Sequence, residues 1–425
     1  RSPGGYLGED VDVLYDFIAS GDTAGRANCD RLWKNGIFAQ GQDRVTGDMN
    51  DFWLDRDLLL HVKNIKAAVL LAHGLNDYNV VPEHSVRIYN EMKAHHMPVS
   101  IYLHQGGHGG NPPAEMVNRW FSHYLYGVNN GVEKDAPVWI VQDANSQAPE
   151  ALIAAHRPPL TTTTTGFESA TITVTPGVRA PAFRGRGAAG EGRGATGGGR
   201  GRGAPQELPT PFASFPVPGS VPVILHPAAG GSAVGGLATR AATGSEKLVD
   251  DVAFSGSANA AATQSNHRLI YATGMLTDTV HISGTPRVTL RIASSKPAAN
   301  LTVWLVMLPY DSTASGRSSS TEGLITRGWA DIQNYKSLTR GGNYESKRPG
   351  EKLVPGKFYD LTFDLEPDDE FVPAGKRLAV MIMSSDREFT LWPEAGTELT
   401  VDLAHSSFAI PIVGGNAALV KAHGM

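Results

Sequence analysis

The sequence predicts two fold classes in one chain, an α/β part over residues 1–135 and an all-β part over residues 136–425. Two observations predict this division. In the first part, short apolar runs alternate with stretches of helical periodicity. In the second part, short β-rich runs alternate with Gly, Pro, Ser and Asn turns, a texture typical of a jelly-roll-like β-sandwich. Between two of those β-rich runs lies a Gly/Arg-rich stretch, residues 179–205.

The composition bounds the function classes that the chain can serve. Hydrophobic residues make up 41% and charged residues 19%, proportions typical of a globular protein with sizeable cores. The formal net charge of -5 gives no electrostatic footprint for nucleic acid or an anionic membrane. The single cysteine, Cys29, excludes an internal disulfide and a multi-cysteine metal site. No apolar run reaches the length of about 18 residues that predicts a membrane span.

Two helical stretches come first and predict a cap segment over about residues 9–62. Glu9–Ala19 has apolar residues close to helical spacing, and Asp51–Val62 reads as a second short helix. In residues 63–127, by contrast, predicted strands alternate with predicted helices. An apolar strand, Ala67–Ala72, leads into a Gly-containing loop that holds Asp77, and a helix opened by Pro82 comes next.

A second apolar strand, Val99–Leu103, leads into a Gly-rich loop that ends at His108, and Ala114–Tyr126 predicts a further helix. Strand, acid, helix, strand and histidine is the order of the late part of an α/β-hydrolase domain. Parallel strands present their carboxyl ends at one edge of a sheet, so we expect Asp77 and His108 to meet there. They have the chemistry of the acid and base of a serine hydrolase.

Other histidines compete for the role of base. His73 and His104 stand at strand ends, where a histidine is usually a structural hydrogen-bonding residue. His108 is preferred because the glycines on both sides of it allow a tight, closely approaching loop. No H-E-x-x-H or CxxC spacing occurs, so we expect no metal and no other cofactor.

The nucleophile is absent from this pattern. No G-x-S-x-G elbow occurs anywhere in the 425 residues, and no serine is assigned the role. We therefore expect the chain to be a fragment that lacks an N-terminal part with the nucleophilic serine, and to be inactive by itself. The missing part of the same protein is then the first partner that we expect for this chain.

Several stretches resemble the Xaa-Pro dipeptidyl-peptidases, which are α/β-hydrolase serine peptidases with cocaine-esterase-like relatives. The specific ones are HGLNDYNVVPEH (73–84) and LHQGGH (103–108), and the opening RSPGGYLGEDVDVLYDF (1–17) and DMNDFWLDRDLL (48–59) look similar. The resemblance is close over about residues 1–140. Over residues 141–425 it extends only to the general pattern of short β-rich runs and turns. It implies that Asp77 is the triad acid and His108 the triad base.

The resemblance also implies a substrate site. Glu9 and Asn79 match residues that hold the free α-amino group of a peptide, and Val80 matches a residue that lines a proline pocket. A buried ammonium group needs a carboxylate and polar acceptors beside it, and the Glu9 side chain would supply that carboxylate. The implied function is release of N-terminal X-Pro dipeptides from peptides with a penultimate proline, through an acyl-enzyme.

Two alternatives stay open: an ester or amide hydrolase of the cocaine-esterase-like type, and a non-catalytic fragment or binding module. The resemblance also leaves a homodimer open, and the Lys-poor, Gly/Ala/Thr-rich composition favours a secreted or periplasmic protein. The stretch 179–205 lacks the repeated aromatic residues of an RNA-binding segment, so we interpret it as a disordered surface insertion. We expect neither a nucleic acid nor a membrane as a partner.

Overall fold

The computed structural model describes Tyr15, Gly21 and residues 24–43, 46–142, 209–311, 323–340, 346–387, 389–390 and 392–423. The chain divides into two compact units, one of Arg1–Pro158 with Leu208–Met425 and one of Pro159–Glu207. The second unit, with the insertion 179–205, lies outside the described residues, and so does Glu9. All of the described residues belong to the first unit.

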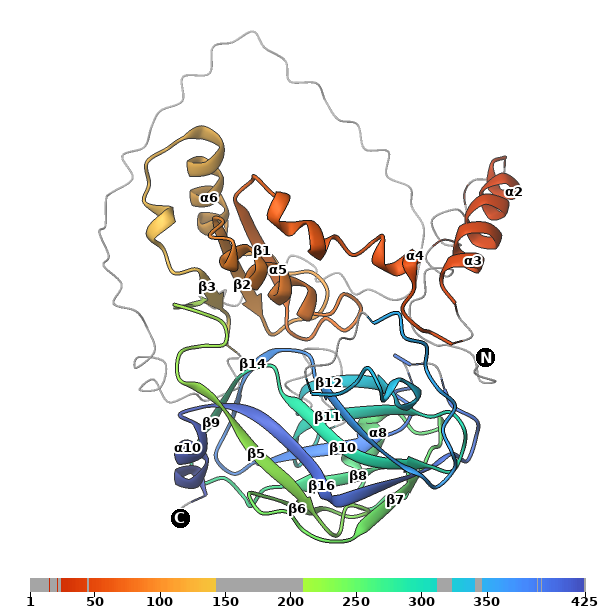
Figure 1. Cartoon of the computed structure of the whole chain (residues 1–425). Coiled ribbons are helices and arrows are strands. Elements are labelled where there is room, and N and C mark those ends of the chain that lie inside the picture. The colour runs from red at the N-terminus through yellow and green to blue at the C-terminus, as the bar shows by residue number, and fades with distance from the viewer. Residues whose placement is uncertain are drawn as a thin grey trace. The chain divides into compact units, whose positions relative to one another are not determined.

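A four-stranded sheet in the order β1-β2-β3-β4 carries the α/β part (Figure 1). Strands β1 (Val69–Gly74), β2 (Val99–His104) and β3 (Val138–Ile140) are parallel, and β4 (Thr210–Phe212) pairs antiparallel with β3. The sequence pattern had grouped residues 138–141 with the β-sandwich strands. That assignment is wrong, because a three-residue apolar strand carries no signal for which sheet it will join.

Helices α5 (Glu83–Ala94) and α6 (Ala114–Tyr126) follow β1 and β2, as the sequence predicts. Pro82 caps α5 at its N-terminus, and α5 buries Val86, Tyr89 and Met92. Helix α6 ends at Gly127, whose φ of 67° is the left-handed conformation that favours glycine. A short 3₁₀ turn, Val132–Lys134, leads on to β3.

The cap segment is less regular than the sequence predicts. Its described elements are α2 (Arg26–Cys29), a π-helical stretch (Asp30–Phe38), α3 (Ala39–Gly41), α4 (Asp51–Leu54) and a 3₁₀ helix (Leu58–Asn64). The expected single helix over Asp51–Val62 is therefore divided in two. The Asp57 side chain accepts the backbone N–H of Leu59 at 2.9 Å, which starts a new turn where one helix would have continued.

The β-rich part is a network of twelve strands along one hydrogen-bonded path and its branches. The strands are β5 (Ser220–Ala228), β6 (Gly235–Ala238), β7 (Ser245–Val249), β8 (Leu269–Ala272), β9 (Val280–Gly284), β10 (Arg287–Ser294), β11 (Asn300–Leu308), β12 (Leu324–Asp331), β13 (Phe358–Asp364), β14 (Asp368–Val372), β15 (Arg377–Met383) and β16 (Glu398–Val413). Two short helices, α8 (Gly256–Ala261) and α10 (Gly415–Ala422), and a 3₁₀ turn (Ile332–Asn334) accompany them. The apolar residues that alternate along these strands form one large core.

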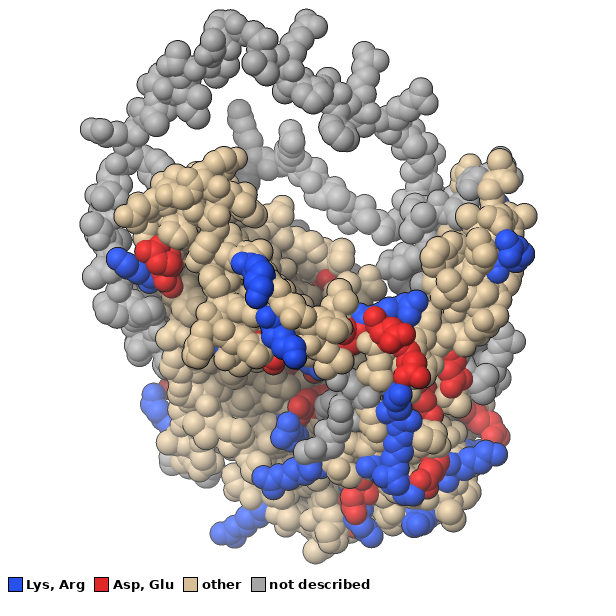
Figure 2. Space-filling view, turned by 45° about the horizontal axis from the view of Figure 1, so that its top comes forward, with Lys and Arg blue, Asp and Glu red and all other residues tan. Residues whose placement is uncertain are grey.

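A second, smaller core joins the two parts of the fold. It contains Leu75 and Tyr89 from the α/β part, and Phe215, Val217 and Val413 from the β-rich part, all buried. On the face in Figure 2, Lys and Arg lie interspersed with Asp and Glu, and no patch of one sign dominates. None of the described helices has both the length and the apolar character needed to cross a membrane.

Candidate active site

The two loops that carry Asp77 and His108 start side by side. Gly74, the last residue of β1, lies opposite His104, the last residue of β2. Backbone bonds then join the loops: the Leu75 N–H donates to the His104 carbonyl at 2.8 Å, and the Asn76 N–H to the Gly106 carbonyl at 3.2 Å. The parallel register therefore delivers both chemistry-bearing residues to one edge of the sheet.

Gly74 allows these loops to approach so closely. A Cβ at this position would lie 2.2 Å from the carbonyl oxygen of Gly106 and 2.4 Å from that of Gly107. Both neighbours are backbone atoms, so a side chain here would push the histidine loop away. The glycine in the H-G-L-N-D stretch thus has a packing reason that is independent of any motif.

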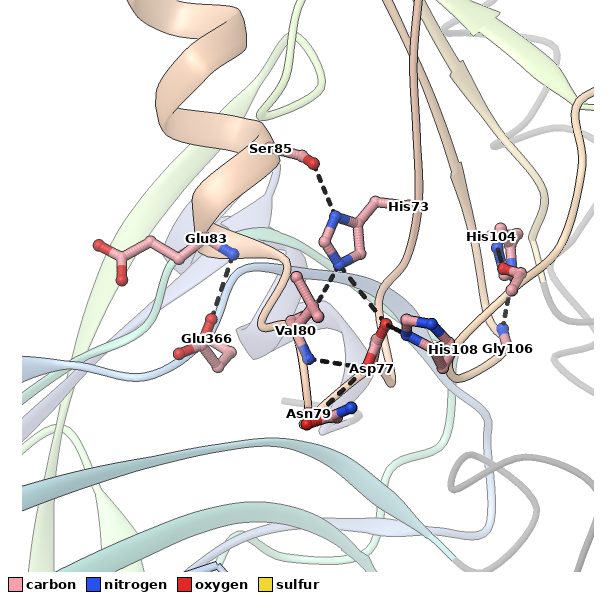
Figure 3. A network of polar contacts seen from close by, with 11 residues as sticks. His73, Asp77, Asn79, Val80, Glu83, Ser85, His104, Gly106, His108 and Glu366 are labelled. Carbon is pink, nitrogen blue, oxygen red and sulfur yellow. Dashed lines mark hydrogen bonds and ion pairs between the residues drawn. The ribbon is translucent and has the colours of Figure 1, made fainter. Parts of the chain in front are cut away.

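Asp77 and His108 form a hydrogen-bonded pair at the ends of these loops (Figure 3). The Nδ1 of His108 lies 2.9 Å from Oδ2 of Asp77. Oδ1 accepts the backbone N–H groups of Asn79 and Val80, each at 3.1 Å. The Asp77 side chain is 6% exposed and the His108 side chain 71% exposed, so a fixed, buried carboxylate orients an accessible imidazole.

This pairing defines what His108 can do chemically. A carboxylate can only accept, so Nδ1 carries the proton and Nε2 keeps its lone pair. Within the described residues, Nε2 has no hydrogen-bond partner. The arrangement is that of a general base whose proton-accepting atom is open and whose cationic form has a carboxylate beside it.

Two of the expected substrate residues follow the acid in the same turn. Asn79 and Val80 both have exposed side chains, 43% for Val80, while their backbone N–H groups are tied to Asp77. The turn therefore presents both side chains outward beside the pair. Glu9, the third expected substrate residue, lies outside the described residues.

His73 and His104 have structural partners that the sequence did not specify. The Nε2 of His73 donates to the Val80 carbonyl at 2.6 Å, and its Nδ1 accepts from the Ser85 hydroxyl at 2.6 Å. Ser85, His73 and Asp77 thus lie in a row, but the Nε2 of His73 is 3.9 Å from Asp77 and is engaged by Val80. His73 holds the acid turn against helix α5.

His104 closes the histidine loop on itself. Its Nε2 donates to the Gly109 carbonyl at 2.8 Å, and its Nδ1 accepts the Gly106 N–H at 3.0 Å. Burial lowers the pKa of His104, and this donor and acceptor pattern fits the neutral ring. The ring also packs against Gly110, where a Cβ would lie 2.4 Å from Nε2.

Residues of the β-rich part also reach this site, and the sequence analysis had missed them. Glu366 accepts the backbone N–H of Glu83, the first residue of α5, at 3.2 Å (Figure 3). Burial, with the charge of Glu83 nearby, raises the pKa of Glu366 to about 8. The Gln105 side chain, in the histidine loop, donates to the Asp369 carbonyl. No local pattern could have identified these residues, since they lie more than 250 positions from their partners.

The described ranges contain no cluster of three or more His, Cys, Asp or Glu side chains that could hold a metal ion.

Comparison with protein families gives two matches that together span most of the chain. Residues 1–110 match the family described as X-Pro dipeptidyl-peptidase (S15 family). Residues 130–423 match the X-Pro dipeptidyl-peptidase C-terminal non-catalytic domain.

Individual relatives agree with these matches. A putative Xaa-Pro dipeptidyl-peptidase of Rhodopirellula baltica is 42% identical over 99% of this chain and 56% of its own length. The chain therefore spans little more than half of this relative.

Two solved structures share the fold. They are an aminopeptidase from a marine sediment archaeon, Thaumarchaeota archaeon, with a TM-score of 0.57 at 13% identity, and a CocE/NonD family hydrolase from Staphylococcus aureus, with the same score and identity. They cover 94% and 90% of this chain, and it covers 64% and 62% of theirs. The fold is thus that of an α/β-hydrolase followed by a C-terminal β-rich domain.

Proposed function

The chain belongs to the X-Pro dipeptidyl-peptidase family, and from this premise we propose that it supplies the acid and the base of a serine peptidase that releases X-Pro dipeptides. The observation that carries the proposal is the Asp77–His108 pair, with its buried carboxylate and its open Nε2. We assign the part up to about residue 135, with β3 and β4 added to its sheet, to the catalytic domain, and the remainder to a jelly-roll-like domain.

The proposed reaction has two steps that use the same pair. His108 takes the proton of a serine hydroxyl at Nε2 while the serine oxygen bonds to the carbonyl carbon of the proline residue. The resulting imidazolium is stabilised by Asp77 and passes its proton to the departing amine. Water then enters by the same route, and the acyl-enzyme is hydrolysed to the free dipeptide and the regenerated serine.

The nucleophile in this proposal lies outside the printed 425 residues. The sequence holds no G-x-S-x-G elbow, and Ser85, whose hydroxyl lies 2.6 Å from a histidine near the acid turn, is bonded to His73 rather than to His108. An elbow places its serine on a sharp turn between strand and helix, whereas Ser85 lies inside helix α5.

The substrate residues follow from the same assignment. Asn79 and Val80 have exposed side chains on the turn of the acid, which suits contact with the first two residues of a peptide. With Glu9, we propose that Asn79 holds the free α-amino group, while Val80 contacts the proline ring. Fixing the amine at a set distance from the serine selects dipeptide release.

The test uses the complete gene product and the chain of residues 1–425 in parallel. A fluorophosphonate probe, which reacts with activated serines, should label the complete product and leave the 425-residue chain unlabelled. Asp77→Asn should lower turnover of an Ala-Pro anilide by about 10⁴-fold, because the histidine loses its orienting carboxylate. Labelling of the 425-residue chain, or full activity of Asp77→Asn, would contradict the proposal.

A panel of free-amine X-Pro substrates and N-blocked esters separates the proposed peptidase from the ester hydrolase alternative. Glu9→Gln in the complete product should reduce turnover of free-amine X-Pro substrates far more than turnover of N-blocked esters. A wild-type preference for simple esters over X-Pro amides, with equal losses for both in Glu9→Gln, would favour the ester hydrolase alternative.

A further inference from the structure

The β-rich part reaches the turn of the catalytic acid through one buried cation, Arg327 in strand β12. The guanidinium carbon lies 3.8 Å from the centroid of the Tyr78 ring and 3.9 Å from that of Phe389. The guanidinium thus contacts two aromatic rings that stand at 75° to each other with centroids 6.1 Å apart, and such contacts favour a delocalised, planar cation. Tyr78 directly follows Asp77, so this contact touches the neighbour of the acid.

A separate set of bonds fixes Arg327 itself. Its Nη1 donates to Oδ2 of Asp386 at 3.1 Å, and the indole N–H groups of Trp304 and Trp329 donate to the same oxygen at 3.2 and 3.1 Å. The Asp386 side chain is fully buried and the Arg327 side chain is 8% exposed. Three donors that converge on one buried oxygen leave the guanidinium little freedom to move.

Stability alone is a poor reason for such a pair. Two charges lose their hydration on burial, and well-packed apolar residues of similar volume are often as stable or more so. The geometry that the pair imposes on Tyr78 accounts better for its presence.

The path continues from Tyr78 to the histidine loop. The Tyr78 hydroxyl donates to the Asn76 side-chain oxygen at 3.2 Å, and the Asn76 amide donates to the Gln105 carbonyl at 3.0 Å. Burial raises the pKa of Tyr78 far above its ordinary value, so the hydroxyl stays a donor. Asn76 and Tyr78 flank Asp77 on both sides, and each is anchored outside the acid turn.

We infer that Arg327 is a positioning residue for the catalytic acid: by stacking on Tyr78, it fixes the turn on which Asp77 faces Nδ1 of His108. The inference rests on the proposed function, which makes Asp77 the triad acid. It gives the domain whose family description is non-catalytic a direct role in the geometry of catalysis. Without Arg327, Tyr78 keeps its edge contacts with Trp329 and Phe389, but the acid turn loses the cation that ties it to strand β12, and the 2.9 Å bond between Asp77 and His108 is held less firmly.

The experiment removes the buried pair as a whole, because removal of Arg327 alone would leave a lone buried carboxylate. The complete gene product carries Arg327→Met together with Asp386→Asn, in which the amide oxygen still accepts the two indole N–H groups. The matched control is Arg287→Met together with Asp364→Asn, an exposed bidentate pair in the same part of the fold.

The double variant should fold and lose kcat on an Ala-Pro anilide by at least about tenfold, with KM changed by less than about threefold. The proton on Nδ1 of His108 reports the hydrogen bond to Asp77, and its low-field resonance in a proton NMR spectrum should weaken or shift upfield in the double variant, because the displaced carboxylate no longer accepts it. The control pair should leave kcat and this resonance unchanged.

A folded double variant whose Nδ1 proton resonance is unchanged overturns the inference, even if kcat falls, because that result indicates a merely structural role. If the double variant does not fold, Phe389→Leu loosens the same contact and leaves the ion pair in place, and an unchanged resonance there has the same meaning. Asp77→Asn is assayed alongside. If Asp77→Asn loses activity while the resonance is unchanged in the other variants, only the positioning role fails; if Asp77→Asn is active, the proposed function fails.

Discussion

At the scale of the residue, the site depends on how closely two loops approach. The buried Asp77 is bonded by two backbone N–H groups and faces His108 at 2.9 Å, and Gly74 lets the loops pass within contact distance. Small displacements matter here, because the efficiency of a positioned base falls steeply with misalignment.

Gly74→Ala should therefore lower both stability and activity. The added Cβ meets two backbone oxygens, and overpacking of this kind costs about 1–3 kcal/mol in the free energy of unfolding. We expect kcat/KM of the complete product on X-Pro anilides to fall at least about tenfold as the histidine loop shifts.

Urea denaturation and steady-state kinetics measure the two effects. Gly236→Ala is the matched control, since it lies in strand β6 and its Cβ would meet only the Ala228 Cβ at 3.4 Å. Equal behaviour of the two variants would argue against the packing role of Gly74.

At the scale of the element, helix α5 is held at both sides of its first turn. His73 binds Ser85 within the helix, and Glu366 of the β-rich part accepts the N–H of Glu83. A buried carboxyl group at a helix N-terminus has opposing influences on its pKa: the helix dipole favours the anion, and burial and Glu83 disfavour it. Burial dominates, and the pKa of Glu366 is raised to about 8.

This raised pKa predicts a pH-dependent stability. Between the unfolded pKa of about 4.3 and the folded pKa of about 8, the folded state binds more protons at Glu366 than the unfolded state does. The contribution of Glu366 to stability is therefore full below this window and declines as pH rises through it, by up to about 1.4 kcal/mol per pH unit.

Glu366→Gln should remove that decline and keep the acceptor for the Glu83 N–H. Free energies of unfolding in urea, from about pH 5 to about pH 8, should fall less steeply for the variant than for the wild type. Glu398→Gln, at a more exposed position paired with Lys247, should not change the slope. If the free energies of unfolding of the wild type and of Glu366→Gln fell equally with pH, this result would refute the titration of Glu366.

At the scale of the whole molecule, the described α/β sheet leaves apolar surface uncovered. Strand β1 is at the end of the strand order β1-β2-β3-β4, and the edge of such a strand can pair with another chain. Helix α6 buries Trp120 but exposes Phe121, Leu125 and Tyr126, the last two by 69% and 81%. Helix α6 is thus only partly packed into a core within the described residues.

The 425-residue chain in isolation should self-associate through this surface. Its weight-average mass in sedimentation or light scattering should rise with concentration, and Leu125→Lys should reduce the rise. Met275→Lys changes an equally exposed apolar residue of the β-rich part, 64% exposed, and should have no such effect. A concentration-independent monomer would show that the exposed face is not adhesive.

The sequence by itself determined the local elements and the chemistry-bearing pair. Periodicity and turn residues predicted β1, α5, β2 and α6 and the β-rich character of the second part, because a strand or helix that packs on one side must repeat its apolar residues with a fixed period. Asp77 and His108 could be paired in advance, since parallel strands place their loops at one edge.

Only the tertiary structure decided which distant residues serve this pair. The sheet that β3 joins, the Glu366 contact with α5 and the Arg327 stack on Tyr78 depend on partners that are far apart along the chain. The period of the apolar residues indicates that a side chain is buried, but it does not indicate which other side chains it packs against. Contacts between the two parts arise from how their surfaces fit together, and a single sequence carries no local signal for that fit.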